Sequence, residues 1–163
     1  MSKGSRLLAV AAAVLTSLAL IAAADANPGR MVGGTGPQSD SGTAYFAITH
    51  SKGGLEYAAG NNTDKLLGTG AATYALKLLP NKNGSFSVTS KNVVFYTGKG
   101  SLSGTAKATV DVTSTAETIT GGKLTLTKGF GSLKGDELTA KFTGTANLKT
   151  NQFVFKYKGT LFG

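Results

Sequence analysis

The sequence predicts an all-β protein, specifically an antiparallel up-and-down barrel, and three observations support this fold class. Short runs alternate apolar and polar side chains with the period of two that a strand with two different faces requires. Glycine is abundant, at 23 of 163 residues, and no cysteine is present. A Gly-rich segment also recurs between neighbouring runs, as a repeated hairpin unit would produce. The runs are enough for about eight to ten strands, which can close a small barrel; a β-sandwich is the alternative.

The N-terminus has the features of a secretory signal peptide. Lys3 and Arg6 precede an apolar run over residues 7–24, and Ala24-Asp25-Ala26 is a small-residue cleavage pattern. We therefore expect a signal-peptide helix over residues 1–26 and a secreted, extracellular or cell-wall-associated protein without a stable membrane span after processing. A retained anchor is the alternative, because the run is almost long enough to cross a bilayer.

Residues 27–42 are rich in Gly, Pro and Ser and are expected to form a flexible leader. A single β domain is then expected over residues 43–163. Its alternating runs lie at residues 43–50, 73–78, 85–89, 123–127, 138–143 and 153–157. Turns are expected at Asn83-Gly84, Gly121-Gly122 and Thr150-Asn151, which tolerate the backbone conformations that tight turns need.

Residues 98–104 (GKGSLSG) are echoed by residues 129–135 (GFGSLKG), and strand-like runs lie on both sides of each copy. The predicted unit is therefore a strand, a Gly-rich corner and a second strand. These corners resemble the strand junctions of the allene oxide cyclase and dirigent barrels, over residues 93–162. The resemblance implies an eight-stranded antiparallel barrel with a ligand cavity, and either a small hydrophobic ligand or a cyclase-like activity. The whole chain also resembles uncharacterised secreted Gly- and Thr-rich β proteins of high-GC Gram-positive bacteria.

If the barrel holds a small apolar ligand, inward-facing apolar side chains are the candidates to contact it. These candidates are Phe46, Ile48, Tyr74, Leu76, Phe95, Phe142, Phe153 and Phe155. In a small barrel such side chains can instead fill the interior and leave no cavity. The sequence leaves both arrangements open.

No catalytic residue, metal site or cofactor is predicted. His50 is the only histidine, and its place at the end of an expected strand is typical of a surface residue. Residues 60–65 (GNNTDK) are expected to form a polar loop, but their spacing does not match an EF-hand. With neither cysteine nor a second histidine, the sequence contains no zinc-binding pattern.

The acidic residues are few and dispersed. A pair such as Glu56 with Asp111 could serve a glycosidase, yet nothing in the sequence selects this pair. Asp136 and Glu137 follow the second Gly-rich corner and are expected to be solvated charges of a turn. A non-enzymatic role is therefore favoured over an enzymatic one.

The chain is basic, with a formal net charge of +9, and its lysines are dispersed along the sequence. Examples are Lys52, Lys77, Lys107, Lys123, Lys141 and Lys156. Their ordinary role is to keep a sheet protein soluble, and their charge would also attract anionic cell-envelope polymers in a salt-sensitive way. Arg30 is the only arginine after the expected cleavage site, which disfavours nucleic acid as a partner. The preferred interpretation is a secreted, non-enzymatic barrel associated with the cell envelope.

Overall fold

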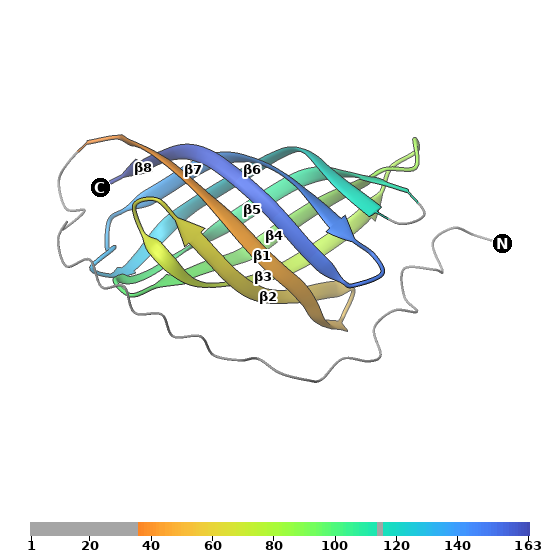
Figure 1. The fold of residues 1–163 in the computed structure, drawn as a ribbon, viewed down its shortest axis with the longest axis horizontal. Coiled ribbons are helices and arrows are strands. Elements are labelled where there is room, and N and C mark those ends of the chain that lie inside the picture. Colours follow the sequence, from red (N-terminus) through yellow and green to blue (C-terminus); the bar gives the residue numbers. More distant parts are fainter. Residues whose placement is uncertain (1–35, 114–115) are drawn as a thin grey trace. The chain divides into compact units, whose positions relative to one another are not determined.

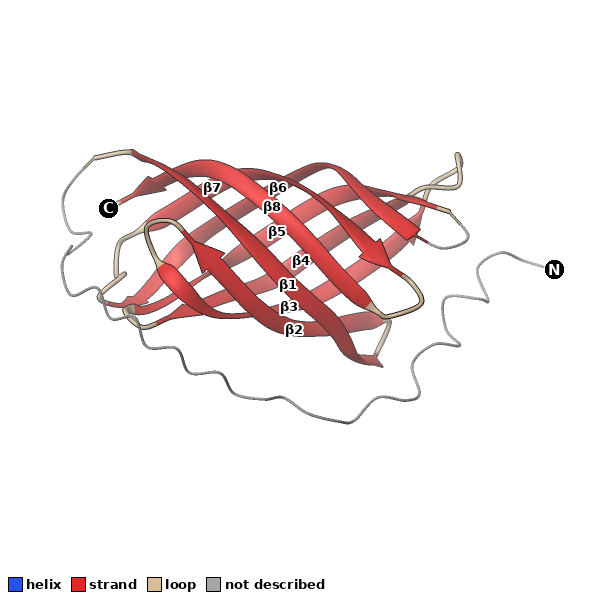
Figure 2. Cartoon of the chain, in the orientation of Figure 1, coloured by secondary structure: helices blue, strands red, loops and turns tan. Residues whose placement is uncertain are grey.

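The computed structural model describes residues 36–113 and 116–163, so the expected signal peptide lies outside the described residues. Eight antiparallel strands close into one barrel (Figure 1, Figure 2). They are β1 (Gln38–Lys52), β2 (Leu55–Asp64), β3 (Gly68–Pro80), β4 (Phe86–Thr97), β5 (Gly100–Val112), β6 (Ala116–Gly131), β7 (Glu137–Asn147) and β8 (Gln152–Phe162). Each strand pairs with its neighbours in the chain, and β8 pairs with β1. The prediction of an up-and-down barrel is confirmed, and the sandwich alternative is wrong.

β1 begins at Gln38, earlier than the expected Thr43. Its first residues pair with the end of β8, with Gln38 opposite Leu161 and Gly42 opposite Tyr157. Asp40 in this segment is buried. Composition alone marks these residues as a leader, but hydrogen bonding to a strand at the other end of the chain makes them part of the sheet.

Two of the three expected turns are confirmed. Asn83-Gly84 lies between β3 and β4 with Gly84 at a φ of 84°, and Asn151 between β7 and β8 has a φ of 54°. The turn expected at Gly121-Gly122 is wrong, because β6 continues through it. The register with β7 shifts between Ile119 and Gly122, so the glycines form a β-bulge that bends the strand.

The two Gly-rich segments lie side by side at one end of the barrel. Gly100 at the start of β5 pairs with Gly131 at the end of β6, and the amide of Ser132 donates a hydrogen bond of 2.9 Å to the Lys99 carbonyl. A Cβ atom on Gly100 would overlap the carbonyl oxygen of Phe130. The repeated glycines therefore permit close approach of two backbones at a single place.

The barrel has a closed end and an open end. The turns β2–β3, β4–β5 and β6–β7 meet at the closed end, on the left in Figure 1. Leu67 and Leu133 lie in two of these turns and are only 3% and 1% exposed. The β1–β2, β3–β4 and β7–β8 turns surround the open end, together with the end of β5 and the start of β6. Among the described residues, no helix is long and apolar enough to cross a membrane.

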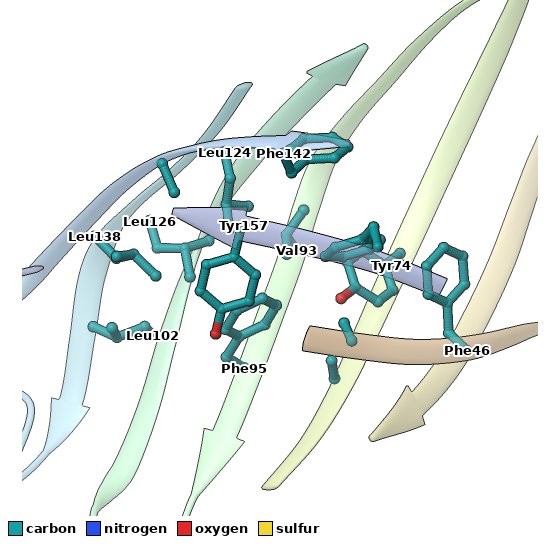
Figure 3. Close-up of a cluster of buried hydrophobic side chains, with 14 of the residues drawn as sticks. Phe46, Tyr74, Val93, Phe95, Leu102, Leu124, Leu126, Leu138, Phe142 and Tyr157 are labelled. Carbon is teal, nitrogen blue, oxygen red and sulfur yellow. The ribbon is translucent and has the colours of Figure 1, made fainter. Parts of the chain in front are cut away.

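The interior of the closed half is filled. Figure 3 shows Tyr157 and Phe95 between a group of leucines and the aromatic rings of Phe46 and Tyr74. The fully buried side chains of this core include Val93, Phe95, Leu102, Leu124, Leu126, Leu138, Tyr157 and Leu161. Side chains of alternate residues thus pack the closed half without disulfide bonds.

Candidate functional site: an apolar cavity at the open end

A cavity of about 70 Å³ lies inside the open half of the barrel. Every strand contributes to its lining, which is mostly apolar. Partly buried hydrophobic side chains continue from the core around this half; they are Ile48, Leu76, Phe86, Val88, Ala106, Ala108, Val112 and Phe153. The interior is therefore filled at one end and partly open at the other.

The aromatic rings in the cavity lining form one cluster around Phe46. The Phe46 ring is stacked on Phe153 with centroids 5.0 Å apart, and it lies 4.8 Å from Tyr74 and 5.2 Å from Phe155. Phe142 contacts Phe155 at 5.2 Å. Aromatic pairs at these separations add about 0.5–1.5 kcal/mol each beyond the area they bury. These aromatic rings, in contact with one another, form a large part of the apolar lining of the cavity.

The structure places the eight sequence-predicted ligand-facing residues in three positions. Six line the cavity: Phe46, Tyr74, Leu76, Phe142, Phe153 and Phe155. Ile48 packs against the core. Phe95 lies deeper, fully buried, with its ring 6.4 Å from Tyr74 and 5.8 Å from Tyr157. Phe95 is thus part of the packed core that bounds the cavity on the side of the closed end.

Two hydroxyl groups in the cavity lining are buried without a hydrogen-bond partner among the described residues. They are Tyr74 Oη and Ser90 Oγ. Burial raises the pKa of Tyr74 above its usual range, so the phenol keeps its proton and can donate. A buried polar group without a partner costs about 1–3 kcal/mol, so these two hydroxyl groups are a destabilising feature of this part of the interior.

Two glutamates, Glu56 on β2 and Glu117 on β6, also line the cavity. Glu117 is 7% exposed. Burial raises the pKa of both carboxyl groups, and the charge of Glu56 raises that of Glu117 further. Both residues line the same cavity, and the charge of Glu56 acts on the carboxyl group of Glu117.

The sequence interpretation did not single out Glu117. Asp111, suggested as a partner for Glu56, is exposed on the outer wall instead. A usable signal was present, because Glu117 shares the face of Ile119 two residues later and both are buried.

A separate polar cluster lies at the closed end. The Tyr157 hydroxyl donates a hydrogen bond of 2.5 Å to Asp64 Oδ2. Asp64 Oδ1 accepts the amides of Leu66 and Leu67 at 2.8 and 2.7 Å. The polar loop expected over residues 60–65 is therefore wrong for most of its length: it belongs to β2, and Asn62 and Asp64 face the interior. Asp64 has a structural role, since it holds the turn that carries Leu67.

Two further carboxyl groups at this end are buried. Asp40 is 2% exposed; its Oδ1 accepts the Ser41 amide at 2.8 Å, while Oδ2 has no partner in the described chain. Burial, together with the charge of Asp64, raises the pKa of Asp40 to about 7. Asp136 is also buried, and burial raises its pKa although Lys99 opposes the shift. The expectation of a solvated Asp136 is wrong, because this residue turns inward where Glu137 turns outward.

His50 lies on the exposed part of β1, where its ring stacks on Tyr57 with centroids 4.5 Å apart. Its Nδ1 is 3.1 Å from the Thr49 hydroxyl. Within residues 36–113 and 116–163, no three metal-ligating side chains come together. His50 therefore has ordinary surface contacts.

Comparison with other proteins adds no assignment to this geometry. No family model matches the chain, and neither a curated protein nor a solved structure matches it.

Proposed function

We propose that this protein is a secreted, non-enzymatic barrel that binds a small apolar molecule at its open end. The observation that carries the proposal is the mostly apolar cavity beside the Phe46 cluster, whose lining also includes the polar residues Ser90, Glu56 and Glu117. Ligand sites are typically apolar with a few convergent polar groups. The open half of this barrel has that composition.

The size of the cavity limits what enters it. At about 70 Å³, it accepts the end of an alkyl chain or a small ring, not a whole lipid. The rest of the ligand would lie against the partly buried side chains around the opening, such as Leu76, Val88 and Phe153. Burial of such apolar area contributes about 25 cal/mol per Å².

The two glutamates set the preferred polar group of the ligand. Burial disfavours the ionised forms of Glu56 and Glu117, and the charge of Glu56 disfavours that of Glu117 further. An ammonium or hydroxyl group on the ligand would stabilise these carboxylates, whereas a ligand carboxylate would add a further negative charge. We therefore expect amines and alcohols to bind more tightly than fatty acids at neutral pH.

Displacement of a fluorescent apolar dye from the purified secreted protein tests this selectivity. Dodecylamine and dodecanol should displace the dye at concentrations about tenfold lower than dodecanoate at neutral pH. Glu117→Gln removes one carboxylate while keeping the side-chain volume, so it should narrow the difference between dodecylamine and dodecanoate. Equal displacement by all three compounds in the unmodified protein would refute the role of the glutamates.

A cavity-filling variant tests the location. Ala108 lines the cavity, while Thr109 on the same strand is exposed on the outer wall. Ala108→Phe should abolish displaceable dye binding, and Thr109→Phe is the matched control that adds bulk outside. If the Ala108→Phe protein remains folded by circular dichroism and binds the dye normally, the ligand does not bind in the barrel.

A further inference from the structure

Four lysines that are far apart in the sequence are direct cross-strand neighbours on the outer wall. Lys107 pairs with Lys123, Lys123 with Lys141, and Lys141 with Lys158. All four side chains are exposed. We call them the lysine row. The sequence shows only dispersed lysines, because the strand register that aligns them is not a local property.

The lysine row is electrostatically unfavourable for the protein by itself. Adjacent strands are only about 5 Å apart, and like charges directly opposite each other destabilise a sheet. None of the four lysines forms a hydrogen bond or ion pair with a described residue. Solubility alone would be served equally well by lysines that are not aligned.

Hydroxyl groups, not carboxylates, flank the row. Along one side, Thr105 pairs with Thr125, Thr125 with Thr139, and Thr139 with Thr160. The row therefore borders a second line of side chains that can donate hydrogen bonds but cannot neutralise lysine.

The same part of the wall contains an open groove. Three members of the row, Lys123, Lys141 and Lys158, line it together with Lys65 and Lys156. Five lysines and one buried aspartate, Asp64, thus line one surface depression, and this excess of lysine concentrates positive potential there.

We propose that the lysine row and its groove bind a linear phosphodiester polymer of the cell envelope. The lysine ammonium group binds phosphate as a point charge on a flexible side chain. It does not require the fixed bidentate geometry of the planar arginine guanidinium group. A row across four strands spans about 15 Å, which suits a chain with repeated single charges more than one isolated anion. The protein's only arginines are Arg6 and Arg30, outside the described barrel, so the surface lacks the side chain that reads nucleic-acid bases most often.

The test measures binding of the secreted protein to poly(glycerol phosphate) as a function of salt. The site variant replaces Lys123, Lys141 and Lys158 with threonine, the residue type of the neighbouring row. The control variant replaces Lys52, Lys91 and Lys149, which are exposed elsewhere, and changes the net charge equally. At about 50 mM salt the site variant should bind about tenfold more weakly or worse, and the slope of log K against log salt should fall by about 2. The control should stay within about twofold of the unmodified protein.

Three outcomes would overturn the proposal. Equal losses in the site and control variants would mean that only net charge matters. Equal affinity of the unmodified protein for single-stranded DNA and poly(glycerol phosphate) would refute the choice of polymer. No binding at low salt would refute the site itself.

Thermal unfolding without polymer provides an independent readout. If the aligned lysines repel one another, the site variant should unfold at a higher temperature than the unmodified protein in low salt, and the gain should shrink as salt screens the repulsion. A site variant that unfolds at a lower temperature than the control variant would show that these lysines support the sheet through their aliphatic stems, against the proposal.

Discussion

Asp40 and Asp64 place two carboxyl groups together at the closed end, but only Asp64 has a full set of donors. Asp64 accepts Tyr157 and two backbone amides. Asp40 accepts one amide and leaves Oδ2 buried without a described partner. Two carboxylates at such a site do not ionise independently. Asp40 therefore keeps its proton up to neutral pH.

This proton makes stability dependent on pH. The pKa of Asp40 is raised from 3.8 to about 7 in the folded protein, so between these values the folded state holds a proton that the unfolded state has lost. The free energy of unfolding should therefore fall as pH rises through this window and change little above it. Since one pKa unit corresponds to about 1.4 kcal/mol, Asp40 contributes a fall of about 2–4 kcal/mol.

Asp40→Asn should reduce the fall in the free energy of unfolding between about pH 4.5 and about pH 8, measured by urea unfolding at both pH values. A shallower fall should remain, because the pKa values of Glu56, Glu117 and Asp136 shift in the same direction. Asp111→Asn, at an exposed position on β5, is the control and should keep the full fall. If the stability of the Asp40→Asn and Asp111→Asn proteins depends on pH in the same way, the proton on Asp40 is not the cause of the pH dependence.

At the level of the strands, alternation of side chains was enough to identify most of the sheet, because the period of two is a local property. Tyr74 with Leu76 and Phe153 with Phe155 illustrate this, since each pair was assigned to the interior and lies there. The bulge at Gly121-Gly122 was not recognised, because a glycine pair reads locally as a turn. The burial of Asp40 and the alignment of the lysine row depend on register between strands, which one sequence does not reveal.

β5 illustrates how closely the strands pack where glycine is present. A Cβ atom on Gly104 would overlap the carbonyl oxygen of Thr125 and lie 2.7 Å from the Leu126 Cα, both in β6. Gly104→Ala should therefore destabilise the protein by about 2–3 kcal/mol, because two backbones would have to separate. Gly98→Ala is the control, since a Cβ there meets nothing within 4 Å. In urea unfolding, Gly98→Ala should change the free energy of unfolding by less than about 0.5 kcal/mol. Similar changes for Gly104→Ala and Gly98→Ala would contradict close packing of the backbone at Gly104.

For the whole molecule, every strand pair except β1–β8 joins neighbours in the chain. The β1–β8 pair closes the barrel and brings Gln38 opposite Leu161. Closure thus depends on one contact between distant parts of the sequence, while the other pairs form between adjacent hairpin strands.

A circular permutant tests this arrangement. A short Gly-Ser linker would join Gly163 to Gly36, and new termini would be placed in the exposed turn between Lys82 and Asn83. Because the joined ends already lie on paired strands, the permutant should keep the β-type circular dichroism spectrum and cooperative unfolding of the original chain. A permutant that is soluble yet lacks this spectrum would argue against the β1–β8 pairing.

Because the number of strands is even, the first strand begins and the last strand ends at the same end of the barrel. β1 starts and β8 finishes at the closed end, where Leu67 and Leu133 seal the core (Figure 1). A tether attached after Gly163 would therefore be anchored on the sealed side. Immobilised in this way on a sensor surface, the barrel would present the Phe46 cavity toward the flowing solution, unobstructed by its own attachment.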